Sequence, residues 1–190
     1  MPARGRPRSP DAQKAILKAA YELLLESGFD EVTVEKIAER AGVGKATIYK
    51  WWPNKAAVVM DGFFSAAADR LPVPDTGSVY EDVLIHATNL TAFMVGPEGR
   101  IIAELIGQGQ LDPALMQAFR MHYIQPRRSE AMLLLNRGSQ RGELKANLSL
   151  ALGVDLLYGP LFYRLLVTGE SLDHEGVKGI VALAFNGLRA

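Results

Sequence analysis

The densest group of side chains that could do chemistry lies in fourteen residues, GVGKATIYKWWPNK, from Gly42 to Lys55. The stretch holds three lysines, one tyrosine and two adjacent tryptophans, more charge and aromatic surface than a segment that only fills a core would carry. On a short helix, Lys45, Tyr49 and Lys50 would face outward, and the free N–H groups at the helix start would favour an anion such as phosphate. These side chains are therefore expected to bind a partner that carries phosphate groups. The alternative is that these lysines only solvate a surface.

Two short helices joined by a tight turn would position these side chains. Thr33 is expected to cap the first helix, which Gly42 ends because glycine tolerates the positive φ of a sharp turn. Gly44 then opens a second short helix that reaches about Trp51 and ends at Pro53. This arrangement, with the second helix rich in basic and hydroxyl residues, is typical of a helix-turn-helix.

Composition describes a chain with enough apolar material for a core and an uneven distribution of charge. Hydrophobic residues make up 48% of the 190 residues, charged residues make up 22%, and the formal net charge is zero. Residues 1–55 hold ten Lys and Arg against seven Asp and Glu, whereas residues 56–190 hold eleven against fourteen, so the two parts carry +3 and −3. The asymmetry indicates an anionic partner for the N-terminal part. The absence of cysteine excludes a disulfide scaffold, a thiol nucleophile and thiolate metal sites, and it suits a cytoplasmic protein.

Apolar residues recur at spacings of three and four along the chain, so we expect an all-α fold of about nine helices. The stretch LPVPDTG, residues 71–77, is rich in proline and glycine and is the best candidate for a domain boundary. Pro126 is expected to kink or split the helix that contains it. The helices are expected near residues 10–27, 33–42, 44–51, 54–70, 78–95, 99–108, 112–138, 149–168 and 173–188.

The most apolar window runs from Leu148 to Thr168 and raises the question of a membrane span. It carries Asp155 and Arg164, and Pro160 breaks its helical pattern, so we expect a buried or interface helix and no membrane partner. The N-terminus MPARGRPRSP is basic, but no apolar segment follows it, so no secretory signal is expected.

The segment TVEKIAERAGVGKATIYKWWPNKAAVV, with AILKAAYELLLESGFDE before it, resembles the DNA-binding domain of the TetR/AcrR family of bacterial transcriptional regulators. In the C-terminal part, DLLYGPLFYRLLVTGE resembles one subgroup of these regulators. The resemblance implies a helix-turn-helix head, a linking helix and a larger helical body for ligand sensing and dimerisation. In this sequence the parts would be a disordered basic arm over residues 1–8, the head over 9–55, the linking helix over 56–71 and the body over 72–190.

The resemblance also implies the partner and the residues that touch it. The partner would be a double-stranded DNA operator, held through its phosphates and through base edges in the major groove. Trp52 falls where relatives carry a core aromatic residue, and packing is the alternative for Trp51 too. Gly44 falls where serine is common, so a hydroxyl that could bind phosphate is missing there. By position, the DNA-binding residues are Thr33, Lys45, Ala46, Thr47, Tyr49, Lys50, Trp51 and Lys55.

The N-terminal arm contains RGRPR, which resembles the short basic core of peptides that bind the minor groove of A-tracts. Arg4, Arg6 and Arg8 would enter the groove, and Pro7 would keep the arm extended. The alternative is a basic tail with no defined partner.

Two apolar stripes in the C-terminal part have helical spacing and predict a contact between two copies of the chain. Two stripes per subunit can form a four-helix bundle, and such a homodimer would place two recognition helices on a pseudo-palindromic site. The alternative is that both stripes are buried within one subunit. The residues of the predicted interface are Leu150, Val154, Leu157, Leu161, Leu165, Val177, Val181, Ala184 and Leu188.

Large apolar residues with a few polar groups among them recur between residues 78 and 168, as they do in pockets for small molecules. They suggest an effector that is medium-sized and mostly apolar or aromatic, and Arg120 could orient a charged group. The alternative for each side chain is a place in the core. The resemblance implies that the effector moves the sixth helix, tilts the fourth and so releases DNA. The candidate pocket residues are His86, Asn89, Phe93, Met94, Glu104, Met116, Phe119, His122, Tyr123, Tyr158 and Phe162.

Signatures of an enzyme are missing, since the sequence has no HExxH, GxSxG, P-loop or dinucleotide-binding glycine pattern. We therefore expect no catalysis, no metal and no cofactor. The predicted function is a ligand-responsive transcriptional regulator, a repressor by family habit. The alternatives are a DNA-binding regulator without an effector and a helical adaptor protein.

Overall fold

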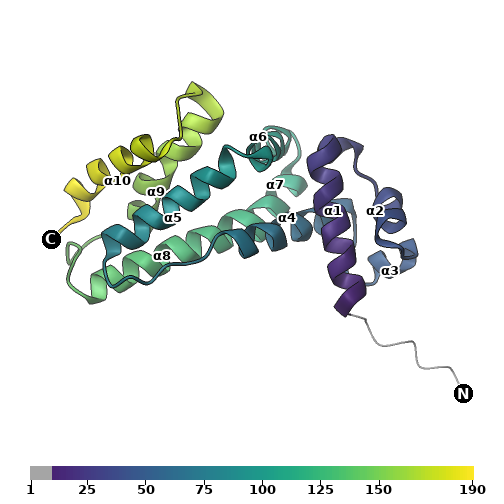
Figure 1. Cartoon of the computed structure of the whole chain (residues 1–190), viewed down its shortest axis with the longest axis horizontal. Coiled ribbons are helices and arrows are strands. Elements are labelled where there is room, and N and C mark those ends of the chain that lie inside the picture. Colours follow the sequence, from purple (N-terminus) through teal and green to yellow (C-terminus); the bar gives the residue numbers. More distant parts are fainter. Residues whose placement is uncertain (1–9) are drawn as a thin grey trace, which may run out of the picture. The chain divides into compact units, whose positions relative to one another are not determined.

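The computed structural model describes residues 10–190, apart from the side chain of Asp69, and all of its regular elements are helical (Figure 1). Within this range one isolated bridge pairs Leu144 with Arg189, and no strand forms. The all-α prediction is confirmed, whereas the predicted arm with Arg4, Arg6 and Arg8 lies outside the described residues. In chain order the elements are α1 (Pro10–Glu31), α2 (Val34–Ala41), α3 (Lys45–Tyr49), α4 (Lys55–Arg70), α5 (Val79–Met94), α6 (Pro97–Gly109), α7 (Pro113–Phe119), the π-helical η1 (Arg120–Ile124), α8 (Gln125–Gln140), α9 (Leu150–Tyr163), the π-helical η2 (Arg164–Thr168) and α10 (His174–Leu188).

The chain divides into two compact units between Ala66 and Ala67, inside α4. We call the N-terminal unit the head and the C-terminal unit the body. The dividing point lies within the predicted linking helix, so α4 belongs to both units and the proline- and glycine-rich stretch 71–77 belongs to the body.

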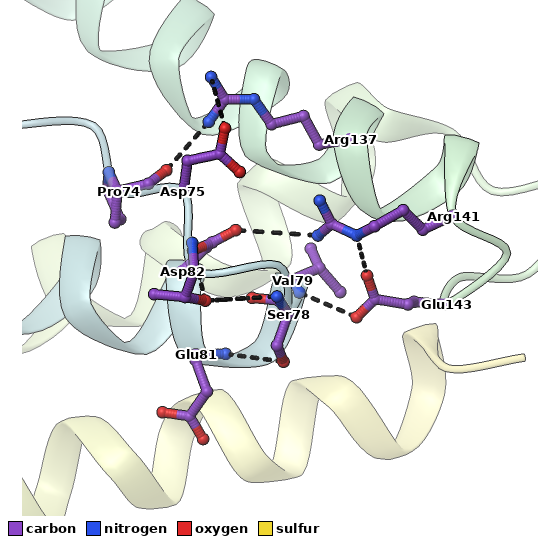
Figure 2. Close-up of polar contacts among 10 residues, drawn as sticks. Pro74, Asp75, Ser78, Val79, Glu81, Asp82, Arg137, Arg141 and Glu143 are labelled. Atoms are coloured by element: carbon purple, nitrogen blue, oxygen red, sulfur yellow. Dashed lines mark hydrogen bonds and ion pairs between the residues drawn. The ribbon is translucent and has the colours of Figure 1, made fainter.

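The loop over residues 71–77 belongs to the body because polar side chains tie it down. Arg137 of α8 donates a hydrogen bond to the carbonyl of Pro74 at 3.0 Å, and Figure 2 shows this contact. The carboxylate of Asp82 in α5 is fully buried and accepts hydrogen bonds from the amide and the hydroxyl of Thr76, at 2.7 and 2.8 Å. A loop with its polar groups bound in this way is a fixed connection to α5.

Local sequence fixes the turn between α2 and α3 in the head. The Thr33 hydroxyl accepts a hydrogen bond from the Lys36 amide at 3.2 Å and so begins α2 as its N-cap. At the other end Gly42 has a φ of 66°, which glycine adopts without steric cost because it has no Cβ. Ile37 of α2 and Ile48 of α3 are fully buried, so the two helices are held against a common core. The helix-turn-helix prediction is confirmed.

The body is built on four long helices that pack side by side. α5 packs against α8 and α10, and α9 packs against α8 and α10, as Figure 1 shows. α6 packs against α5 and α7. The largest fully buried side chains of the body are Phe93, Met94, Ile101, Phe119, Tyr123 and Phe185.

Proline interrupts the long helix predicted over residues 112–138. Pro126 lies in the first turn of α8 and cannot donate a hydrogen bond to the carbonyl four residues earlier. The preceding turn, η1, is π-helical, and the Gln125 amide bonds to the Arg120 carbonyl. The predicted break is therefore observed, and it takes the form of one wide turn between α7 and α8.

The stripes predicted to form the dimer interface are mostly buried inside a single chain. Of these residues, Val154, Leu157 and Leu161 on α9 and Val177, Val181, Ala184 and Leu188 on α10 are buried, and Leu150 and Leu165 are half-buried. α9 and α10 turn these stripes toward the core that they share with α5 and α8, so most of these side chains have little surface left for a second copy, and the dimer interface stays a prediction. Other large apolar residues are exposed, among them Leu152, Leu156, Tyr163 and Val167 on α9 and η2 and Leu183 on α10. We call these residues the exposed stripe.

One helical segment among the described residues, Leu150–Thr168, is long and apolar enough to cross a membrane by length and composition, with a mean hydropathy of 1.5. Asp155 and Arg164 lie within it. Its apolar residues divide between the core of the body and the exposed stripe, which accounts for its hydropathy without a bilayer.

Candidate nucleic-acid interface and candidate effector cavity

The outer surface of α3 presents most of the predicted DNA-binding residues. Lys45, Ala46, Tyr49 and Lys50 are exposed, and Thr47 and Trp51 are half-buried. Ile48 faces the opposite way and is fully buried, so the core fixes which side of this short helix faces solvent. The exposed side therefore offers two ammonium groups and one phenol, which is 54% exposed, on adjacent turns.

Lys45 forms an ion pair that a phosphate could replace. Its ammonium lies 2.9 Å from Oε1 of Glu35 in α2, and this hydrogen bond raises the pKa of Lys45 and lowers that of Glu35. Both side chains are more than half exposed, and exposed ion pairs are weak. Lys45 is thus charged and held near the start of α3, and little free energy opposes its transfer to another anion.

Trp52 anchors the segment that follows α3. Its ring is 4% exposed, and its indole Nε1–H donates to Asp61 Oδ2 of α4 at 2.6 Å. Trp51 lies edge-on against it, with ring centroids 5.5 Å apart. The expected core role of Trp52 is confirmed, and the half-buried Trp51 keeps part of its ring at the surface.

Two of the predicted DNA-binding residues have structural partners within the head. The Lys55 ammonium donates to the carbonyl of Phe29 at 2.9 Å and lies 4.3 Å from the centroid of its ring. It therefore ties the start of α4 to the end of α1, a role that the sequence did not indicate because Phe29 is far away along the chain. The Thr33 hydroxyl caps α2. A DNA contact by either residue stays a prediction.

The body contains a cavity of about 340 Å³ whose wall is mostly apolar. Of the predicted pocket residues, His86, Met116, Phe119, Tyr123, Tyr158 and Phe162 line it, and so does Arg120. Asn89, Phe93, Met94, Glu104 and His122 do not line it. Phe93 and Met94 are instead buried at the end of α5, and Glu104 accepts a hydrogen bond from Gln108 on its own helix. The remaining wall is formed by Leu90, Ile106, Ile124, Arg127, Arg128, Ala131, Val154, Asp155 and Gly159.

The wide turn η1 supplies a side of this cavity. Arg120, Tyr123 and Ile124 all lie in η1 and all line the cavity. π-Helical turns are rare in proteins, but those that do occur are often found at functional sites. Pro126 lies just after η1 and can be recognised in the sequence. It therefore marks the position of this cavity wall as well as the break in the helix.

Polar groups meet at one side of the cavity. His86 Nδ1 and the Tyr158 hydroxyl are 2.7 Å apart and share a hydrogen bond. Burial raises the pKa of Tyr158 and that of Tyr123, so both phenols are neutral at physiological pH. Arg127 pairs with Glu130 at 2.7 Å and Arg128 pairs with Asp155. Neither arginine was predicted from the sequence as a cavity residue, because charged residues rarely enter an apolar wall unless they are paired.

Comparison with known proteins agrees with this division into head and body. Residues 16–60 match the family model of bacterial regulatory proteins of the tetR family, and residues 73–184 match that of the tetracyclin repressor-like C-terminal domain. The uncharacterized HTH-type transcriptional regulator YdeS of Bacillus subtilis is 58% identical over 98% of this chain and 94% of its own.

Solved structures give the same result. The TetR family transcription regulator SCO0332 superposes with a TM-score of 0.85 at 37% identity, covering 95% of this chain and all of its own. The transcriptional regulator FadR from Bacillus subtilis, crystallised in complex with stearoyl-CoA, superposes with a TM-score of 0.70 at 20% identity, covering 91% of this chain and 97% of its own. At that identity the likeness to FadR concerns the fold.

Proposed function

Because this chain belongs to the TetR family of DNA-binding transcriptional regulators, we propose that it is a repressor that a small molecule releases from DNA. Family members are transcriptional regulators rather than enzymes. The protein would act in the cytoplasm as a homodimer on a pseudo-palindromic operator. The effector would be mostly apolar or aromatic and would occupy the cavity of the body. The observation that carries the DNA-binding half is the exposed basic side of α3, held in place by buried Ile48 and Trp52.

DNA would be gripped by the exposed side of α3. Lys45, Lys50 and Tyr49 would bind phosphates, and Ala46 and Thr47 at the start of the helix would approach base edges in the major groove. Gly44 supports this arrangement, because a Cβ added there would meet nothing within 4 Å and the turn is therefore open to solvent. The Arg4, Arg6 and Arg8 arm would add minor-groove contacts.

The second copy of the chain would cover the exposed stripe, in place of the buried stripes that the sequence suggested. Leu152, Leu156 and Tyr163 follow helical spacing along one side of α9, and Leu183 is 74% exposed on α10. Exposed apolar residues that gather in this way mark interfaces.

The cavity supports the proposal that a small molecule binds to the body. Its volume of about 340 Å³ falls within the range of small-molecule sites, which is about 300–1,000 Å³. Its wall is mostly apolar, with the His86–Tyr158 pair as a polar group that could orient a ligand. FadR, which shares the fold, was crystallised in complex with stearoyl-CoA, a molecule with a long apolar part.

Two experiments, carried out one after the other, test the proposed function. Selection of bound fragments from genomic DNA should return a single half-site motif repeated with two-fold symmetry. Candidate effectors are then titrated against the preformed complex, since a ligand releases DNA only if it prefers the state that does not bind DNA. Selection of no DNA at low salt would contradict the regulator. Selection of DNA that no cavity ligand releases would favour a regulator without an effector.

A further inference from the structure

A buried arginine joins the wall of the cavity to the end of α4. Arg127 is 8% exposed, it lines the cavity, and its Nη1 donates to the carbonyl of Leu71 at 3.4 Å. Leu71 is the first residue after α4 and is itself buried. Carbonyls at the C-terminal end of a helix carry partial negative charge, so a cation bound there holds that end in place.

Two contacts of Arg127 differ in strength. Nη2 lies 2.7 Å from Glu130 Oε1, a short charge-assisted contact, whereas the bond to the Leu71 carbonyl is at the long end of the hydrogen-bond range. A displacement of Glu130 would therefore carry the guanidinium with it, and the weaker bond to Leu71 would break first.

Two buried atoms next to this pair have hydrogen bonds still to make, one on His86, which lines the cavity, and one on Glu130, which does not line it. His86 Nε2 and Glu130 Oε2 are both buried, are 3.7 Å apart, and have no hydrogen-bond partner among the described residues. An unsatisfied buried polar atom is costly, so these two atoms favour an arrangement in which a ligand supplies the missing bonds. Neighbouring side chains cover both atoms in the ligand-free chain, so a ligand can reach them only if the wall moves.

We propose that His86, Glu130 and Arg127 form a relay through which occupancy of the cavity reaches α4. The ligand has an apolar or aromatic body and one N–H, hydroxyl or carbonyl group that bonds to His86 and Glu130. Glu130 turns toward this group, Arg127 follows Glu130, and the Leu71 carbonyl is released. The relay rests on the proposed function, because it requires the cavity to be a ligand site.

The chain provides a matched control for Arg127. Arg137 holds the same loop three residues farther on, through the carbonyl of Pro74 at 3.0 Å and Asp75 at 3.7 Å, as Figure 2 shows. It also lies on α8, but it does not line the cavity. A change at Arg137 therefore loosens the loop and leaves the relay intact.

The test uses N-phenyl-1-naphthylamine, a fluorescent aromatic probe with one N–H group, and the full-length protein. R127M/E130M removes both charges together, so that neither stays buried without its partner. R137Q is the control.

Probe fluorescence gives the Kd, and hydrogen–deuterium exchange of residues 67–73 reports the end of α4. In the wild type, the probe should raise exchange there roughly tenfold. R127M/E130M should exchange fast without the probe and should not respond to a saturating concentration of it, while its Kd rises because the bond to Glu130 is lost. R137Q should respond as the wild type does.

Each other outcome has a defined meaning. A wild type that binds the probe without a change in exchange overturns the relay and leaves the proposed function standing, as does a double variant that responds like the wild type. A wild type that does not bind the probe counts against the cavity as a ligand site and overturns the relay together with the effector half of the proposed function. If R127M/E130M does not fold, R127K replaces it, because a single ammonium cannot span the carbonyl and the carboxylate as the guanidinium fork does.

Discussion

Two neighbouring leucines separate the face of α9 that a second copy would cover from the face that holds one chain together. Leu157 is 1% exposed and Leu156 is 49% exposed in the single chain. Successive residues of an α-helix point about 100° apart, so one side chain faces the core while the other belongs to the exposed stripe. If the proposed dimer forms through this stripe, changes at the two positions should have different effects.

Leu156→Lys should dissociate the dimer and leave the chain folded. Full burial of a leucine side chain is worth about 1.5–3 kcal/mol, and about half of that is still available to a partner at Leu156. The two-fold axis would place this residue in the interface twice, so the loss is about 1.5–3 kcal/mol, or roughly a 10- to 150-fold increase in the dimer Kd. Leu157→Ala should instead lower the free energy of unfolding by about 2–5 kcal/mol, because it leaves a cavity in the core.

Sedimentation equilibrium measures the dimer Kd of each variant, and urea unfolding measures its stability. An unchanged Kd for Leu156→Lys would refute the assignment of the exposed stripe as the dimer interface. Loss of folded structure in Leu156→Lys, rather than dissociation, would show that Leu156 belongs to the core. Leu183→Lys on α10 is a second test of the same face and should weaken the dimer in the same way.

Three further predictions concern the head and the last helix. Lys45→Ala should reduce the slope of log K against log salt for operator binding by about 0.9, because one phosphate contact is lost, and Lys18→Ala on the exposed side of α1 should leave it unchanged. Thr33→Ala should lower the free energy of unfolding by about 1 kcal/mol through loss of the α2 cap, as urea unfolding would show. The Gly176 amide and the Ser171 hydroxyl lower the pKa of Asp173, the N-cap of α10, so its contribution to stability is complete above the unfolded-state pKa and is lost as pH falls through the lower folded-state value. Asp173→Asn should therefore remove that part of the acid sensitivity, measured by thermal unfolding between about pH 2 and 7.

The head could be predicted because its determinants are local. Thr33 and Gly42 stand at the two ends of α2, and each acts through contacts within a few residues along the chain. The burial of Ile48 then decides which side of α3 is exposed. Lys55 is the exception, since its partner Phe29 is remote in sequence and only the folded head brings the two together.

The body was harder to predict because helical spacing reveals an apolar face without revealing what covers it. α9 has two such faces, one with Leu157 in the core and one with Leu156 at the surface, and both have the spacing of a buried stripe. The cavity depends on contacts such as His86 with Tyr158, which join helices far apart in the chain. Arg127 was missed because its burial depends on Glu130 and on the Leu71 carbonyl together, and no local pattern reports the second partner.

The wide turn η1 has a consequence for protein engineering. A π-helical turn closes its hydrogen bond over one residue more than an α-helical turn, so η1 holds a surplus residue between α7 and α8. Excising a single residue between Arg120 and Ile124, together with Pro126→Ala, would let one regular α-helix run from Pro113 into α8 with the rest of α8 in its present orientation. Such a shortened protein would keep the framework of the body and lose this wall of the cavity, so a molecule that occupies the cavity could no longer bind there.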